Sequence, residues 1–201
     1  MNPSDSVTDS QWRSEVTQIV TNFMRRRLSK RGYEWSVPSD APLPGSEHQT
    51  LIQAMNLIAD SMLRENGAAI RDMSNRAVTQ NDVSYSSFRV IADEMFTEGI
   101  QWPLVVMLLL FGSELALVLG AASDSCQVNE SFVNQVNEWL IRYLSSSQSL
   151  KTWILSHGHW NGLIQYTGLS NRKLTGNMMK LVVGSLVTVT LATVLHFFVK
   201  A

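Results

Sequence analysis

Residues Pro103 to Ala122 read PLVVMLLLFGSELALVLGAA, and this stretch decides the fold. The helix that it predicts is apolar on every face except near Ser113 and Glu114. Such a helix either spans a membrane or forms the buried centre of a helical bundle. A charge near the middle is costly in lipid, so Glu114 favours the buried centre over the membrane-spanning alternative.

The segments on both sides of this stretch show helical spacing of apolar residues and no β-alternation of useful length. We predict helices at residues 11–31, 46–66, 68–78 and 84–96 before it, and at 130–144, 150–155 and 160–166 after it. Gly67 is expected to separate the second helix from the third. Because each helix has an apolar face that needs a partner, the predicted fold class is all-α, a bundle around one central hydrophobic helix.

The first predicted helix carries basic residues on its outer face between positions 25 and 31. We interpret this face as solvated, with contact to anionic lipid as the alternative. Gly32 follows at the position where a glycine commonly ends a helix. Three prolines then predict a loop over residues 36–46.

The C-terminal residues Leu181 to Val199 read LVVGSLVTVTLATVLHFFV, nineteen residues without an acid or a lysine. About twenty apolar residues in a helix cross the hydrocarbon core of a bilayer. We therefore predict a transmembrane tail anchor at 179–199, after a flexible N-terminus at 1–8, a bundle at 9–169 and a linker at 170–178. A buried core helix is the alternative, because His196 and three threonines make the stretch only moderately apolar.

Composition excludes several classes of protein. The net charge of −1, with no long basic stretch, lacks the electrostatic pattern of a nucleic-acid-binding protein. The single cysteine, Cys126, excludes a disulfide within the chain, and the first eight residues do not resemble a signal peptide. We expect a reducing environment that faces the cytosol.

Four stretches resemble the homology motifs of the Bcl-2 family and occur in the family's order. IVTNFMRRRLSKRGYEW (Ile19–Trp35) is similar to Bcl homology motif four, and MNLIADSML (Met55–Leu63) to motif three. EMFTEGIQWPLVVMLLLFG (Glu94–Gly112) resembles motif one, and WILSHGHWNGLIQYTG (Trp153–Gly168) resembles motif two. The resemblance implies a Bcl-2-like helical bundle that regulates apoptosis by binding amphipathic death-motif helices, the BH-three helices, in a hydrophobic groove.

The resemblance also implies two sets of functional residues, for which packing of the core is the alternative role. One wall of the partner-helix groove would consist of Met62, Asn66, Ala69, Ile70 and Met73, and the other wall and the floor of Met95, Gln101, Leu104, Val106 and Phe111. The chain's own death-motif helix would use Leu51, Met55, Ile58, Ala59, Asp60 and Met62. Methionines would give the groove an adaptable lining.

Motif one departs from the family pattern at its centre. Family members usually have asparagine, tryptophan, glycine and arginine where this chain has Gln101, Trp102, Pro103 and Leu104. The arginine that would pair with a ligand's aspartate is absent. A charge-assisted hydrogen bond contributes about 1.5–3 kcal/mol, so we expect affinity for standard ligands to be about ten-fold to a hundred-fold lower.

No catalytic or metal site is predicted, and no cofactor. His157 and His159 flank a glycine without a clear third ligand, which is weak evidence for a metal site. Asp60 and the adjacent Asp93 and Glu94 are interpreted as ordinary acids on solvated faces. A phosphate-binding loop and a nucleophile elbow are both absent from the sequence, so we do not expect an enzyme.

Two functions remain within the resemblance. LSKRGYEW (28–35) and WLIRYL (139–144) resemble survival-promoting members, whereas FRVIADEMF (88–96) and the tail resemble Bax/Bak-like effectors. We favour a survival factor that binds pro-apoptotic BH-three proteins or other family members, with its bundle in the cytosol and its tail in the outer mitochondrial membrane or the endoplasmic reticulum. The alternatives are an effector that oligomerises and permeabilises that membrane, and a tail-anchored helical adaptor outside the family.

Overall fold

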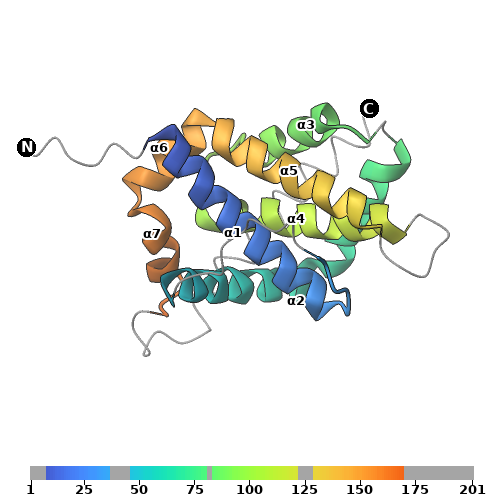
Figure 1. Cartoon of the computed structure of the whole chain (residues 1–201), viewed down its shortest axis with the longest axis horizontal. Helices are drawn as coiled ribbons and strands as arrows, with labels where there is room; N and C mark the ends of the chain where they lie inside the picture. Colours follow the sequence, from blue (N-terminus) through green and yellow to red (C-terminus); the bar gives the residue numbers. More distant parts are fainter. Residues whose placement is uncertain (1–7, 37–45, 81–82, 122–128, 170–201) are drawn as a thin grey trace, which may run out of the picture.

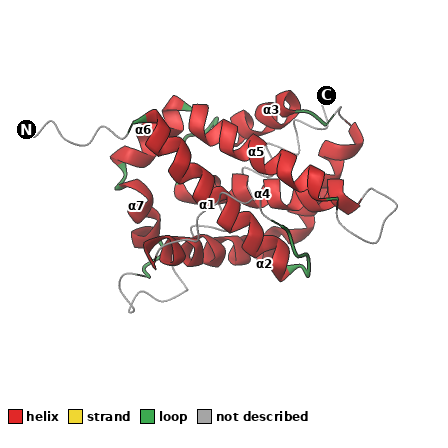
Figure 2. Cartoon of the chain, in the orientation of Figure 1, coloured by secondary structure: helices red, strands yellow, loops and turns green. Residues whose placement is uncertain are grey.

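The computed structural model describes residues 8–36, 46–80, 83–121 and 129–169, which form seven α-helices and no strand (Figure 2). The helices are α1 (Asp9–Lys30), α2 (Ser46–Gln80), α3 (Tyr85–Met95), α4 (Trp102–Ala121), α5 (Glu130–Ser146), α6 (Gln148–Ser156) and α7 (His159–Tyr166). The all-α prediction is confirmed for these residues. The predicted linker at 170–178 and tail anchor at 179–199 lie outside them, as do residues 1–7 and 37–45.

The central helix of the bundle is α4, which lies behind α1 and α5 and above α2 in the view of Figure 1. It packs against α1, α2, α3 and α5. Every residue from Trp102 to Leu117 is buried. Among the described helices, α4 alone is long and apolar enough to cross a membrane, yet its apolar stretch is 94% buried inside the protein. The interpretation of this stretch as the buried centre of a bundle is therefore confirmed.

The buried charge on α4 has a partner at the end of α1. Glu114 is 3% exposed. Its Oε1 atom lies 3.6 Å from Nη1 of Arg31, the residue that caps α1. Because a buried carboxylate without a partner is strongly unfavourable, this contact fixes the end of α1 over α4.

The sequence sets both ends of α1. The hydroxyl of Thr8 accepts a hydrogen bond from the backbone of Gln11, and the Gln11 side chain accepts one from the backbone of Thr8, which completes a capping box. At the other end Gly32 has a φ of +83°, and its N–H donates to the carbonyl of Ser29. The predicted end of the helix before Gly32 is confirmed.

The break predicted at Gly67 is confirmed to within one residue, because α2 consists of two helical segments joined at a kink. The kink lies at Asn66, whose φ of −131° and ψ of 17° are not helical. Gly67 lies under the side chain of Arg71, with Nη1 3.5 Å from the point where a Cβ would be. Glycine inside a helix costs about 1 kcal/mol relative to alanine, so a break next to Gly67 agrees with its weak helix propensity.

Two short helices, α6 and α7, close the end of the bundle where α1 begins (Figure 1). The indole of Trp12 on α1 stacks on that of Trp160 on α7, with ring centroids 5.7 Å apart. The Nε1 of Trp12 also donates to the carbonyl of Leu144 on α5 at 3.3 Å. This aromatic contact joins the first described helix to the last.

Candidate functional site

The first half of α2 carries the residues predicted as the chain's own death motif. The apolar members share one buried face and are each at most 3% exposed: Leu51, Met55, Ile58, Ala59 and Met62. α2 packs against α4, α7 and α1. The structure therefore brings the predicted motif residues together but turns their apolar face into the core.

The acid of this motif, Asp60, is held by two cations of α1. Its carboxylate accepts hydrogen bonds from Nη1 of Arg27 at 2.6 Å and from Nζ of Lys30 at 2.7 Å. Arg27 is 4% exposed and also reaches Oδ1 of Asn56 at 3.4 Å. Partial burial acts to raise the pKa of Asp60, but these hydrogen bonds and charges outweigh it and lower the pKa below its usual value.

These contacts correct two interpretations made from the sequence. Arg27 is not on a solvated face, because its guanidinium is buried between α1 and α2. Asp60 is not an ordinary solvated acid either, since it joins the two helices. The pairing could not be read from the sequence, because the partners are about thirty positions apart.

The ten residues predicted to receive a partner helix come from α2, α3, α4 and the turn before α4. On α2 these are Met62, Asn66, Ala69, Ile70 and Met73, and the others are Met95, Gln101, Leu104, Val106 and Phe111. Seven of them are at most 2% exposed, and only Asn66, Ala69 and Gln101 are half-buried. These ten residues define a strip above α4, with the second half of α2 on one side and α3 on the other. We call this strip the α2–α3 seam. The seam is closed in this structure.

α3 is fastened to α5 rather than to α2. The Tyr143 hydroxyl on α5 donates to the Asp93 carboxylate at 2.9 Å, and the Arg142 guanidinium lies 4.2 Å from the ring centroid of Tyr85. Burial, followed by the Asp93 contact, raises the pKa of Tyr143 well above its usual value. Phe88 is buried between these elements, with its ring stacked on that of Phe111.

α2 and α3 are not among the closely packed helix pairs of the described bundle, although each packs on α4. The kink at Asn66 adds an unusual polar atom to this region. The Nδ2 of Asn66 is buried and has no hydrogen-bond partner in the described structure. An unpaired buried donor of this kind is unfavourable, so a ligand that supplied an acceptor here would gain from it.

Motifs one and two meet through their tryptophans. The ring centroid of Trp102 lies 6.2 Å from that of Trp160 and 5.0 Å from that of Trp153. His157 and His159, which lie between Trp153 and Trp160 in the sequence, have separate contacts. The ring of His157 stacks on that of Trp153, and Nε2 of His159 lies 3.1 Å from Oε2 of Glu15. Among the described residues no group of three histidines, cysteines or acids is placed to bind a metal ion.

Sequence reasoning missed the cluster around Glu15. A cavity of about 60 Å³ between α1, α2 and α7 is lined by Glu15, His48, Leu51, His159, Trp160, Asn161 and Ile164. Burial raises the pKa of Glu15, and the nearby histidines act in the opposite direction. Glu15 looks like any other acid on an amphipathic helix, so only the tertiary structure distinguishes it.

Comparison with known proteins shows which family this sequence matches. The family described as "Apoptosis regulator proteins, Bcl-2 family" matches residues 55–160, just over half of the 201-residue chain. Apoptosis regulator R1 of Xenopus laevis is 23% identical, over 83% of this chain and 69% of that protein. Human Bcl-2-like protein 1 is 24% identical, over 75% of this chain and 82% of that protein.

Solved structures show the same fold. Trichuris suis BCL-2 has a TM-score of 0.65 at 19% identity, over 86% of this chain and 99% of that chain. Trichoplax adhaerens trBcl-2L2 bound to trBak BH3 has a TM-score of 0.63 at 21% identity, over 75% of this chain and 95% of that chain. Chicken BOK has a TM-score of 0.62 at 20% identity, over 79% of this chain and 98% of that chain.

The family match begins within the buried face of α2, includes the whole of the α4 core helix and ends at Trp160, where motifs one and two meet. On this sequence match and the shared fold, the chain belongs to the Bcl-2 family of apoptosis regulators.

Proposed function

We propose that this chain restrains cell death by binding the BH-three helix of pro-apoptotic partners, or of other family members, in the α2–α3 seam. The bound helix would lie on α4 between the α2 wall and the α3 wall, in contact with the ten seam residues named above. The Trichoplax relative was solved with a BH3 bound, which supports this mode of binding. Regulation by binding, rather than catalysis, is the common property of the family.

The observation that carries the proposal is the state of the chain's own death motif. Its apolar face is buried, and its acid is fastened to α1 by two short contacts, from Arg27 and from Lys30. A protein that donates this motif to others must first break these contacts. A protein that receives another helix at the seam must uncover its seven buried residues, but it can keep these contacts, because α2 and α3 are not closely packed against each other.

The proposal places the bundle in the cytosol, held at the outer mitochondrial membrane or the endoplasmic reticulum by the segment at 179–199. This segment lies outside the described residues, and its composition alone supports the anchor.

A second function, permeabilisation of that membrane by oligomers of this chain, is favoured by one observation. α4 satisfies the length and composition of a membrane-spanning helix although it is buried. An effector of this kind would release α2 from α1 and bring α4 to lipid. The cost of placing Glu114 in lipid opposes this function.

Mitochondria that lack their own pore-forming effectors distinguish the two functions. Full-length protein is added with and without a BH-three peptide, and cytochrome c release is followed. We expect no release in either case, and reduced release when the protein is added to mitochondria that carry an effector. Peptide-dependent release by this chain alone would overturn the survival function.

A matched pair of variants tests the seam in the same assay. Ala69 is half-buried on the proposed α2 wall, whereas its neighbour Ala68 is exposed. Ala69→Glu should abolish protection, and Ala68→Glu, which adds the same charge outside the wall, should retain it. Equal protection by both variants would exclude the seam as the binding site.

A further inference from the structure

The orientation of α3 determines which of its charges border the seam. Tyr85, Asp93 and Phe96 face α5, because they contact Arg142 and Tyr143 there. In an α-helix the residues on the opposite side are Ile91 and Glu94. Of these two residues, Ile91 is buried and Glu94 is half-buried. Glu94 therefore lies on the side of α3 that faces away from α5, toward the seam.

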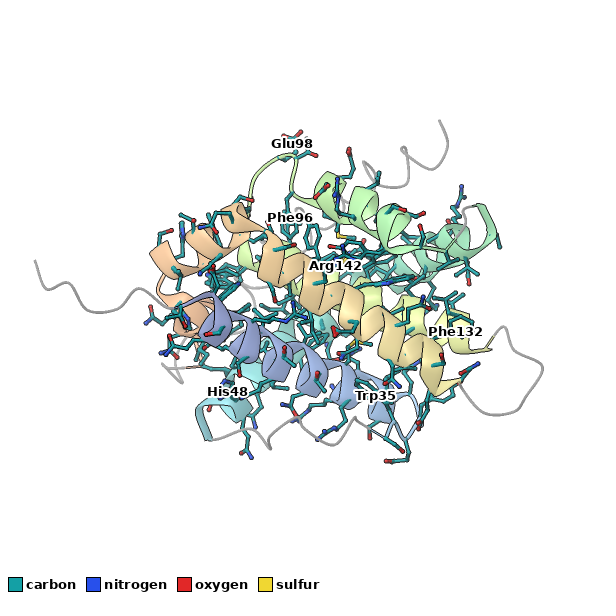
Figure 3. All side chains as sticks on the ribbon, turned by 45° about the horizontal axis from the view of Figure 1, so that its top comes forward. Trp35, His48, Phe96, Glu98, Phe132 and Arg142 are labelled. Atoms are coloured by element: carbon teal, nitrogen blue, oxygen red, sulfur yellow. The ribbon has the colours of Figure 1, made fainter. Side chains whose placement is uncertain are left out.

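The turn after α3 carries a second acid. Glu98 is exposed, and Figure 3 shows it at the outer edge of the connection between α3 and α4, above Phe96. Neither Glu94 nor Glu98 forms an ion pair in the described structure. Both carboxylates are available to a ligand.

The α2 side of the seam carries the same sign of charge. Glu65, Asp72 and Arg76 share a helical stripe with the wall residue Ala69, at steps of four, three and four. The Arg76 Nε lies 2.9 Å from the Asp72 carboxylate, so this cation is already paired. In the described structure Glu65 accepts a hydrogen bond from the hydroxyl of Ser61 at 3.2 Å.

Nothing basic lies at the position between the two walls where the family pattern has arginine. Leu104 takes this position and is 2% exposed. The seam is thus bordered by Glu65, by the Asp72–Arg76 ion pair and by Glu94, and the exposed Glu98 follows in the turn after α3. Between them lie apolar residues and the unpaired Nδ2 of Asn66, which would donate a hydrogen bond to a carbonyl or amide oxygen of a docked chain.

We propose that the seam selects amphipathic helices with lysine or arginine beside the apolar face, and does not require the acid that standard ligands carry. This inference rests on the proposed function, because it names the partner chemistry of that same site. Charge complementarity around an apolar contact governs the choice of partner and the association rate more than the total affinity. The negative border attracts basic helices and repels acidic ones, and Leu104 offers an acidic helix no compensating bond.

The test uses two synthetic helical peptides with the same apolar residues at steps of four, three and four. One carries lysine and the other glutamate at the positions beside this face. Binding to the full chain is measured by fluorescence anisotropy at low and at high salt. We expect the lysine peptide to bind at least about ten-fold more tightly at low salt, and the ratio to fall as salt screens the charges.

Charge-reversal variants locate the effect. Glu94→Lys and, separately, the exposed Glu98→Lys should each reduce the preference for the lysine peptide several-fold. Glu138→Lys makes the same change at an exposed position of α5 and should leave the ratio unchanged. Thermal melts of each variant show that it is folded, and Glu98→Lys still tests the border if Glu94→Lys is unstable.

The outcomes separate the two proposals. Equal binding of both peptides, or tighter binding of the glutamate peptide, overturns charge selection and leaves helix binding at the seam standing. Failure of both peptides to bind overturns the proposed function and this inference with it. A preference for lysine that Glu138→Lys removes as strongly as Glu94→Lys would place the contact on α5 and also overturn the inference.

Discussion

At the scale of the residue, Asp60 determines how firmly the death-motif face of α2 is held in the core. It neutralises the buried Arg27 guanidinium, whose Nε atom already lacks a hydrogen-bond partner. Asp60→Asn keeps the shape of the side chain but leaves this cation without a counter-charge. We expect a loss of about 1–3 kcal/mol in the free energy of unfolding, measured by urea denaturation. The lower part of this range is favoured, because the Asp60 side chain is 36% exposed.

The pH dependence gives an independent check on Asp60. Its pKa is lower in the folded protein than the ordinary 3.8, so the contact stabilises the fold above that pH and is lost as pH falls through the folded value. The difference between wild type and Asp60→Asn should therefore shrink on acidification below about pH 4. Asp72→Asn, which removes an exposed pair with Arg76, is the control. An equally large effect of Asp72→Asn would contradict the special role of Asp60.

A second residue, Leu104, sets the chemistry between the seam walls. Leu104→Arg supplies the cation that the family pattern places here, next to an acidic border. We expect a BH-three peptide that carries the standard aspartate to bind about ten-fold more tightly, as measured by calorimetry. The same variant should lose stability, because Leu104 is buried and an arginine disturbs its packing. Unchanged affinity in a folded variant would count against the seam geometry.

At the scale of the element, the contact between α7 and α1 responds to pH through Glu15. Burial raises the pKa of Glu15 above the ordinary 4.5, so the folded protein holds this proton to higher pH than the unfolded chain does. Stability from this group is greatest below pH 4.5 and falls as pH rises through the folded pKa. The contact with His159 opposes this effect, because it acts to lower the pKa of Glu15.

Glu15→Gln removes this titration. We expect the free energy of unfolding of wild type, relative to the variant, to decrease as pH rises from about 4.5 to neutral. Urea denaturation at a series of pH values measures this difference. The variant Glu138→Gln changes an exposed position on α5, and its free energy of unfolding should vary with pH as that of wild type does. A constant difference between wild type and Glu15→Gln across this range would show that Glu15 does not titrate with folding.

Helix positions were largely predictable because they depend on local signals. Periodicity located all seven helices, and Gly32 ends α1 as expected. The break predicted at Gly67 lies one residue from the observed kink at Asn66, since the weak helix propensity of glycine is also a local signal. Contacts such as Tyr143 to Asp93, fifty positions apart, have no local signal, so the attachment of α3 to α5 was not predictable.

The candidate site rests on a different kind of prediction. The family resemblance named the residues of the seam, and the structure places them on α2, α3, α4 and the turn before α4. Their burial could not be read from the motifs, because a closed seam and an open one require the same apolar residues. The acidic border needed the orientation of α3, which only its contacts with α5 reveal.

At the scale of the whole molecule, one continuous core joins all seven described helices, and α4 supplies its centre. A single core of this kind is expected to unfold in one cooperative transition. A helix that enters the seam binds only the folded protein, so it must stabilise the whole bundle through mass action. The closed seam does not change this argument, because the measured affinity already includes the cost of opening it.

Thermal unfolding with the lysine-flanked peptide therefore distinguishes a receiver from an effector. At a free peptide concentration one hundred times the dissociation constant, the stabilisation is about 2.7 kcal/mol. For a protein of this size, each kcal/mol raises the melting temperature by about 2–4 °C, so we expect one transition shifted upward by about 5–10 °C. An effector would instead release α2 and α4 when it binds, which would lower the melting temperature or split the transition. Differential scanning calorimetry detects both signatures, and a split transition would contradict the survival function independently of any mitochondrial assay.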